Sequence, residues 1–90
     1  SGAQAPEAGL QIVGVSDGDT IRRAGNGPAP ELRLEARGGQ AELIWLLNGQ
    51  QIGRLPGGRA LHHRFSEAGR YQITVMDEAG RHDRVEISVR

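Results

Sequence analysis

The segment Phe65–Val89, FSEAGRYQITVMDEAGRHDRVEISV, decides the fold of this chain. Apolar and polar residues alternate from Arg70 to Met76 and again from His82 to Val89, and the residues DEAG separate the two runs. Successive side chains of a strand point to opposite faces, so each run predicts a strand with one buried and one solvated face. Because Asp and Gly favour a turn, the segment predicts a closing antiparallel hairpin.

Five segments further upstream also predict strands: Leu10–Val15, Glu31–Arg37, Glu42–Leu47, Gln50–Gly53 and Arg59–Phe65. Between Leu47 and Gln50 lies Asn48-Gly49, a pair that suits a type I′ hairpin because both residues tolerate positive φ. Turn or loop residues separate the other segments: Ser16–Thr20, Ala24–Pro30, Gly38-Gly39 and Leu55–Gly58. Seven short strands without a helical stripe predict an all-β, immunoglobulin- or fibronectin-III-like antiparallel sandwich.

Length and composition set limits on the organisation. The 90 residues suffice for one domain. Ser1–Gly9 is small, polar and contains Pro and Gly, so it predicts a linker or arm, and residues 10–90 form the single sandwich domain. There is no Met at the start, no signal peptide and no apolar run of membrane-spanning length, so we expect a piece of a longer protein that does not itself insert into a membrane.

The charges exclude one class of partner. Eleven basic residues, all Arg, balance eleven acidic ones, and like charges form no long run, so a nucleic acid is not an expected partner. The absence of Cys rules out disulfides and thiolate zinc sites, and it leaves the redox compartment open.

The three aromatic residues predict a core. Trp45 and Tyr71 stand where immunoglobulin-like sandwiches place a core Trp and a corner Tyr, whose hydroxyl returns to the backbone near the preceding turn. With Phe65 they are interpreted as structural. The expected core is Leu32, Leu34, Trp45, Leu47, Phe65, Tyr71, Ile73, Val75, Val85, Ile87 and Val89.

Histidines are the first candidates for chemistry. A zinc site would need His62, His63 and His82 to converge with a carboxylate such as Asp83. Adjacent residues of a strand point to opposite faces, so His62 and His63 cannot serve one site without a bulge. No metal site is therefore predicted.

Other polar residues give no catalytic site either. The residues DGDT resemble part of a calcium loop, but the acidic residue after Asp19 is Glu31, so a turn is the ordinary interpretation. Asp77 and Glu78 lie in a predicted turn, where we expect solvated carboxylates. The serines have no base partner in a suitable motif. No catalytic residue and no cofactor are predicted.

A candidate interaction face is predicted where the alternation of apolar and polar residues breaks down, because apolar residues then occupy outward positions. If Leu43, Trp45 and Leu47 face the core, Ile44 and Leu46 point outward. The strand that carries Tyr71 then directs Thr74 and Met76 outward, and the two strands are neighbours in this fold. Ile44, Leu46, Thr74 and Met76 would form one apolar patch, which either receives a partner, is covered by the chain's own arm or loop, or consists of ordinary scattered apolar residues.

Three segments carry a family resemblance: GLQIVGVSDGDTIRR at residues 9–23, LIWLLNGQQIG at 43–53 and EAGRYQITVMDEAGRHDRVEISV at 67–89. Together they resemble the C-terminal domain of bacterial penicillin-binding protein 1C, in which an opening S-x-DG segment, a W-x-L-N/D-G hairpin and a closing hairpin recur. Ala68 replaces a frequent Pro before Gly69, a change that affects only a turn.

The resemblance implies a periplasmic parent, anchored in the inner membrane, that synthesises peptidoglycan with glycosyltransferase and transpeptidase domains N-terminal to this one. The transpeptidase Ser-x-x-Lys motif is missing here, so this chain is expected to be an inert accessory domain. Its implied partners are the parent's transpeptidase domain or an envelope protein such as bacterial α2-macroglobulin. A peptidoglycan-binding module and a passive spacer of an unrelated surface protein remain as alternatives.

Overall fold

Eight strands form the framework of the computed structural model, which describes residues 9–23, 25–39 and 41–90. They are β1 (Gln11–Val13), β2 (Thr20–Ile21), β3 (Glu31–Arg37), β4 (Glu42–Leu47), β5 (Gln50–Pro56), β6 (Leu61–Arg64), β7 (Gly69–Asp77) and β8 (His82–Val89). The arm expected at residues 1–9 lies, apart from Gly9, outside the described residues. No helix occurs in the described ranges, and hence none that could cross a membrane.

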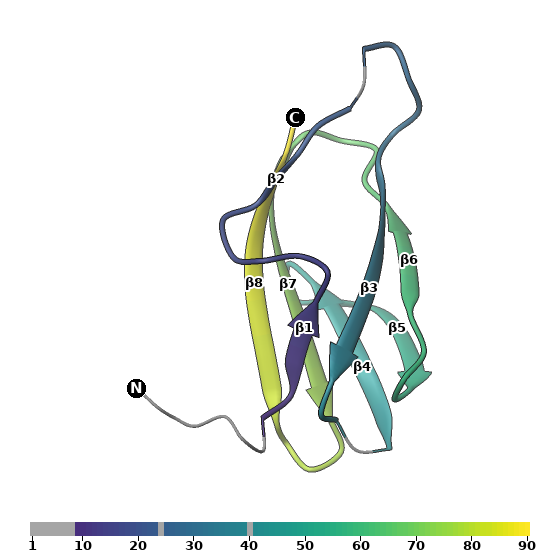
Figure 1. Ribbon diagram of the computed structural model, residues 1–90, viewed down its shortest axis with the longest axis vertical. Coiled ribbons are helices and arrows are strands. Elements are labelled where there is room, and N and C mark those ends of the chain that lie inside the picture. The colour runs from purple at the N-terminus through teal and green to yellow at the C-terminus, as the bar shows by residue number, and fades with distance from the viewer. Residues whose placement is uncertain (1–8, 24, 40) are drawn as a thin grey trace.

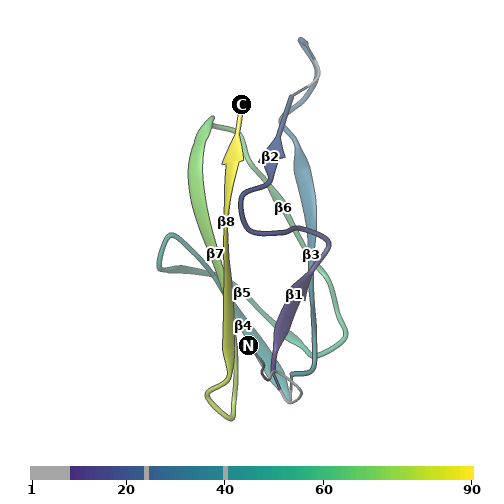
Figure 2. The ribbon, with the colours of Figure 1, turned by 60° about the vertical axis from the view of Figure 1, so that its left-hand side comes forward.

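The strands form two facing sheets (Figures 1 and 2). One sheet has the order β1-β3-β6 and the other the order β2-β8-β7-β4-β5. All pairings are antiparallel except that of β2 with β8, which is parallel. The predicted sandwich is therefore confirmed, with one correction. Thr20 was expected to end a turn and Ile21 was assigned to no strand, but together they form β2, an eighth, parallel strand at the sheet edge.

The chain passes from one sheet to the other between β1 and β2, and the residues SDGD stabilise this connection through hydrogen bonds. The N–H of Gly18 donates to the carbonyl of Glu86 at 2.7 Å, and the N–H of Glu86 donates to Oδ1 of Asp17 at 2.7 Å. Oδ2 of Asp19 accepts the N–H of Ser16 at 2.8 Å. Both carboxylates thus bind backbone groups of a turn and the neighbouring strand, as in ordinary turn chemistry.

The predicted hairpins are present with small changes in their bounds. In the β4–β5 turn, Asn48 has φ 51° and Gly49 has φ 85°, the positive values that a type I′ turn requires. Strand β5 continues through Leu55 to Pro56, although these residues were expected to interrupt it. A proline is tolerated there because β5 is an edge strand, where a missing N–H removes no bond to a further strand.

The core lies between the sheets. The members with no more than 2% exposure include Trp45, Leu34, Ile73 and Val75. The predicted core omitted four buried residues: Leu10, Ile12, Val15 and Leu43. Three of them belong to β1 or its flanks, and this strand is too short to show clear alternation. Leu32, Leu47 and Tyr71 are only partly buried and pack against the core.

An aromatic corner joins the turn before β7 to the core. The hydroxyl of Tyr71 donates to the carbonyl of Glu67 at 2.6 Å. The rings of Tyr71 and Phe65 meet edge to face with centroids 4.9 Å apart, and Phe65 is 2% exposed. This bond is the return of a corner Tyr to the backbone near the preceding turn.

Candidate functional site

Four side chains of β4 and β7 form an apolar stripe on the outside of the larger sheet. Ile44 lies directly opposite Met76, and Leu46 lies opposite Thr74, so the register brings together the four residues selected from the sequence. We call this stripe the β4–β7 face. All four are partly buried, and no described large apolar side chain is fully exposed, because cross-strand neighbours cover much of each side chain.

Charged and polar residues border the β4–β7 face on both sides. On β5, Arg54 lies in register with β4 and forms an ion pair with Glu42 at 3.1 Å. On β8, His82 and Arg84 lie in register with β7, and both are exposed. The face is therefore a narrow apolar stripe with a polar rim, the arrangement that small protein interfaces use.

The outside of the smaller sheet has a different character. Arg33 pairs with Glu35 at 2.9 Å, and Arg64 pairs with Glu31 at 3.4 Å. His62 lies beside Arg33 in the register of β3 and β6 and is exposed. Charges of both signs cover this surface, as expected for a sheet face that stays in water. The apolar stripe is thus a feature of one sheet and not of the sandwich in general.

The histidines are spread over the molecule. His62 is exposed, whereas His63 is partly buried and its ring meets that of Phe65 at 4.8 Å. Oδ2 of Asp83, the carboxylate considered as a zinc ligand, accepts the N–H of Ile12 at 2.9 Å. Within the described ranges no three His, Asp or Glu side chains are grouped as a metal ion would require.

Asp77 differs from its expected solvated state. It is the last residue of β7 and is only 7% exposed. Its Oδ1 accepts the N–H groups of Ala79 at 3.0 Å and of Arg81 at 2.9 Å, which organises the turn into β8. The expectation was wrong because the side chain of a strand-terminal Asp folds back over its own turn.

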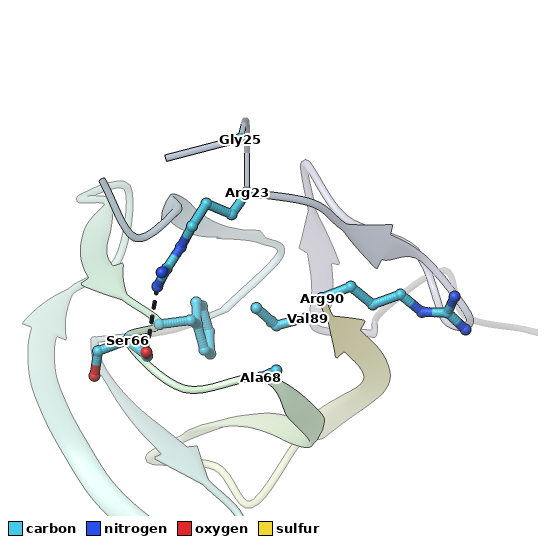
Figure 3. A pocket seen from close by; sticks show the side chains of 7 residues that line it. Arg23, Gly25, Ser66, Ala68, Val89 and Arg90 are labelled. Carbon is cyan, nitrogen blue, oxygen red and sulfur yellow. Dashed lines mark hydrogen bonds between the residues drawn. The ribbon is translucent and has the colours of Figure 1, made fainter. Parts of the chain in front are cut away.

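A cavity of about 340 Å³ lies at the end of the sandwich near the start of β7. It is lined by Arg23, Gly25, Phe65, Ser66, Ala68, Val89 and Arg90. Figure 3 shows the side chain of Arg23 reaching across to Ser66, whose carbonyl accepts a hydrogen bond from Nη2 at 3.4 Å, while the side chain of Arg90 extends away. Sequence analysis did not single out Arg23, because its neighbours here lie far away in the chain.

Comparison with known proteins places the chain in a family. The model of the Penicillin-Binding Protein C-terminus Family matches residues 1–87. This chain belongs to that family. Penicillin-binding protein 1C of Escherichia coli (strain K12) is 37% identical over 71 residues, which are 79% of this chain and 9% of the relative. The chain therefore spans about a tenth of the length of that relative.

A solved structure of fibronectin(III)-like modules of Clostridium thermocellum CbhA has a similar fold. The TM-score is 0.58 at 12% sequence identity, and the match covers 89% of this chain and 92% of the other. At this identity the likeness shows the fold alone.

The three segments that carry the family resemblance have structural roles in this member. The first contains the sheet-crossing turn at Asp17, the second contains the Asn48-Gly49 turn, and the third is the β7–β8 hairpin with the Tyr71 corner. The family pattern thus describes how the sandwich closes, and the β4–β7 face lies on strands of the second and third segments.

Proposed function

We propose that this chain is a non-catalytic accessory domain that docks through its β4–β7 face onto the transpeptidase domain of its own parent penicillin-binding protein. The observation that carries the proposal is the apolar stripe of Ile44, Leu46, Thr74 and Met76 on one outer sheet face, opposite a charged outer face. Two sheet faces of one small domain, both open to water, would otherwise be expected to have similar composition.

The size of the stripe favours an occupant within the same polypeptide. Four partly buried side chains offer less area than the roughly 800 Å² per partner of a stable complex between separate proteins. A tethered partner needs less area, because a short linker supplies an effective concentration of about millimolar. The relative from Escherichia coli is about ten times longer than the matched region, so a parent of that kind has ample chain to act as the partner.

The parent's activity is part of this proposal. Family membership supports a parent that makes peptidoglycan in the periplasm and is anchored to the inner membrane, with glycosyltransferase and transpeptidase chemistry in its other domains. The described residues of this chain support a non-catalytic role, since the carboxylates of Asp17, Asp77 and Asp83 accept hydrogen bonds from backbone N–H groups.

Binding of glycan strands is less well supported. Sugar-binding sandwiches use exposed aromatic rings as platforms, and this chain has one Trp, one Tyr and one Phe. Trp45 is 0% exposed and Phe65 is 2% exposed, and Tyr71 uses its hydroxyl in the corner bond. None of the three rings lies flat on the surface as a platform would.

The test is an NMR titration of the isotope-labelled chain with the purified transpeptidase domain of its parent and, separately, with muropeptides. We expect the transpeptidase domain to shift resonances of the β4–β7 face. Each side chain of the face is already half-buried, so complete burial of Ile44 or Leu46 would contribute about 1 kcal/mol more. The double variant I44T/L46T should then weaken binding about 30-fold.

V13T is the matched control. Val13 is a partly buried apolar residue in register with Glu35 on the other outer face, so the same type of change there should leave the affinity within about twofold. Equal loss in both variants, or no loss in I44T/L46T, would contradict docking through this face. Shifts with muropeptides alone would favour glycan binding, and shifts with neither ligand would leave a spacer or a separate envelope protein as partner.

A further inference from the structure

The cavity at the end of the sandwich combines an apolar floor with a cationic rim. Phe65 and Val89 are 2% and 4% exposed and close its bottom, and Ala68 adds a small apolar wall. Arg23 lies above them, and none of the described lining side chains is acidic. The cavity therefore offers a small apolar surface beside a positive charge.

Arg23 has unused capacity for hydrogen bonds. A guanidinium has five N–H donors in a planar fork. The Arg23 side chain has one recorded bond within the described residues, to the carbonyl of Ser66 at 3.4 Å, which is long for an N–H···O bond. Its backbone N–H donates to the main-chain oxygen of Arg90 at 3.0 Å, so the start of the side chain is fixed at the mouth of the cavity (Figure 3).

The chemistry of a matching ligand follows from the apolar floor of the cavity and from the unused hydrogen-bond donors of Arg23. A carboxylate would accept two parallel bonds from the guanidinium and would replace a weak bond to a neutral carbonyl with a charge-assisted pair. The apolar floor would contact a hydrophobic group close to that carboxylate. The volume of about 340 Å³ is at the small end of the range for ligand pockets and suits one or two amino-acid residues.

We infer that this cavity binds the C-terminal carboxylate of a short peptide, with the last side chain of the peptide on Phe65 and Val89. The carboxylate pairs with Arg23, and the hydrogen bond from Arg23 to Ser66 yields to it. The lining residues do not include any member of the β4–β7 face, so this site is separate from the proposed docking surface, and either can fail without the other.

The test uses three probes on the isotope-labelled chain: N-acetyl-glycyl-valine, its C-terminal amide, and acetate. We expect the peptide acid to shift the amide resonances of Arg23, Ser66, Ala68 and Val89 saturably. The amide should leave them unchanged, because it lacks the negative charge. Acetate should bind at least about tenfold more weakly, because it has no side chain for the apolar floor.

Two variants separate the role of Arg23 from general charge. R23Q should weaken binding of the peptide acid about tenfold through loss of the bidentate pair. R22Q removes the same charge from the exposed neighbour of Arg23, which is not among the described residues that line the cavity, so the affinity of this variant should stay within about twofold of that of the parent sequence. Four results would each overturn the inference: equal binding of the peptide acid and its amide, equal binding of acetate, equal effects of R23Q and R22Q, or no saturable shift.

Discussion

Replacement of Asp83 by Ala tests how the first strand is joined to the second sheet. Oδ2 of Asp83, on β8, accepts the N–H of Ile12, on β1, at 2.9 Å across 71 residues of sequence. Ile12 is 4% exposed, so its N–H lies where water has little access. This bond connects an edge strand of one sheet to a strand of the other, and the variant removes the acceptor while it leaves the donor in place.

The cost has two sources. A hydrogen bond to a charged group contributes about 1.5 to 3 kcal/mol, and a buried N–H left without a partner costs about 1 to 3 kcal/mol. The two ranges describe overlapping effects, and Asp83 is only partly buried, so we expect Asp83→Ala to lower the free energy of unfolding by about 2 kcal/mol. For a domain of this size that corresponds to a Tm lower by about 8 to 16 °C.

Urea denaturation followed by the fluorescence of Trp45 measures this change. Trp45 is the single Trp of the chain and is 0% exposed, so its emission reports unfolding directly. D83N keeps an oxygen acceptor without the charge and should lose about half as much stability. D19A is the matched control: the Asp19 carboxylate accepts an exposed N–H three residues away, and its loss should cost about 0.5 kcal/mol.

Two results would refute the reasoning. One is a free energy of unfolding for D83A within about 0.5 kcal/mol of the parent sequence, which would mean that water satisfies the Ile12 N–H at no cost. The other is an equal loss for D83A and D19A, because only the first carboxylate joins the two sheets.

Two further predictions concern the aromatic core. Trp45→Ala removes the largest of the fully buried side chains and should lower the free energy of unfolding by about 3 to 5 kcal/mol, which is close to the whole stability of a small domain. Circular dichroism should therefore show loss of the cooperative thermal transition. A melting curve like that of the parent sequence would contradict the expected core role of Trp45. Tyr71→Phe keeps the ring against Phe65 but loses the 2.6 Å hydrogen bond to the carbonyl of Glu67. The free energy of unfolding should fall by about 1 kcal/mol, measured in the same assay. An unchanged Tm would show that this hydrogen bond contributes nothing to stability.

The β4–β7 face shows which structural features the alternation of apolar and polar residues can predict. Alternation placed Ile44 and Met76 on outward positions, and knowledge of which strands are neighbours in a sandwich placed them side by side. The observed register sets these two residues directly opposite each other. The degree of burial did not follow from the pattern, since the stripe is covered in part by neighbouring strands. Whether a partner binds there stays a prediction.

Other features could not be read from the pattern. The sequence analysis considered Asp83 only as the carboxylate of a zinc site that it did not predict, and it assigned Asp83 no other role; in the fold Asp83 accepts a backbone N–H from β1. The two-residue strand β2 has no periodicity to detect, and its parallel pairing with β8 depends on the turn at Asp17. The end cavity depends on Arg23 meeting Ser66, two residues that no local motif connects.

The sequence by itself determined the strands with clear alternation, the Asn48-Gly49 turn, the pairing of the closing hairpin and the family. These features depend on interactions between residues near each other in the chain, where side-chain period and φ preference act directly. Only the tertiary structure decided the sheet crossing, the role of Asp83 and the end cavity. Their contacts join residues 43 to 71 positions apart, and the relative placement of two packed sheets determines which of these residues meet.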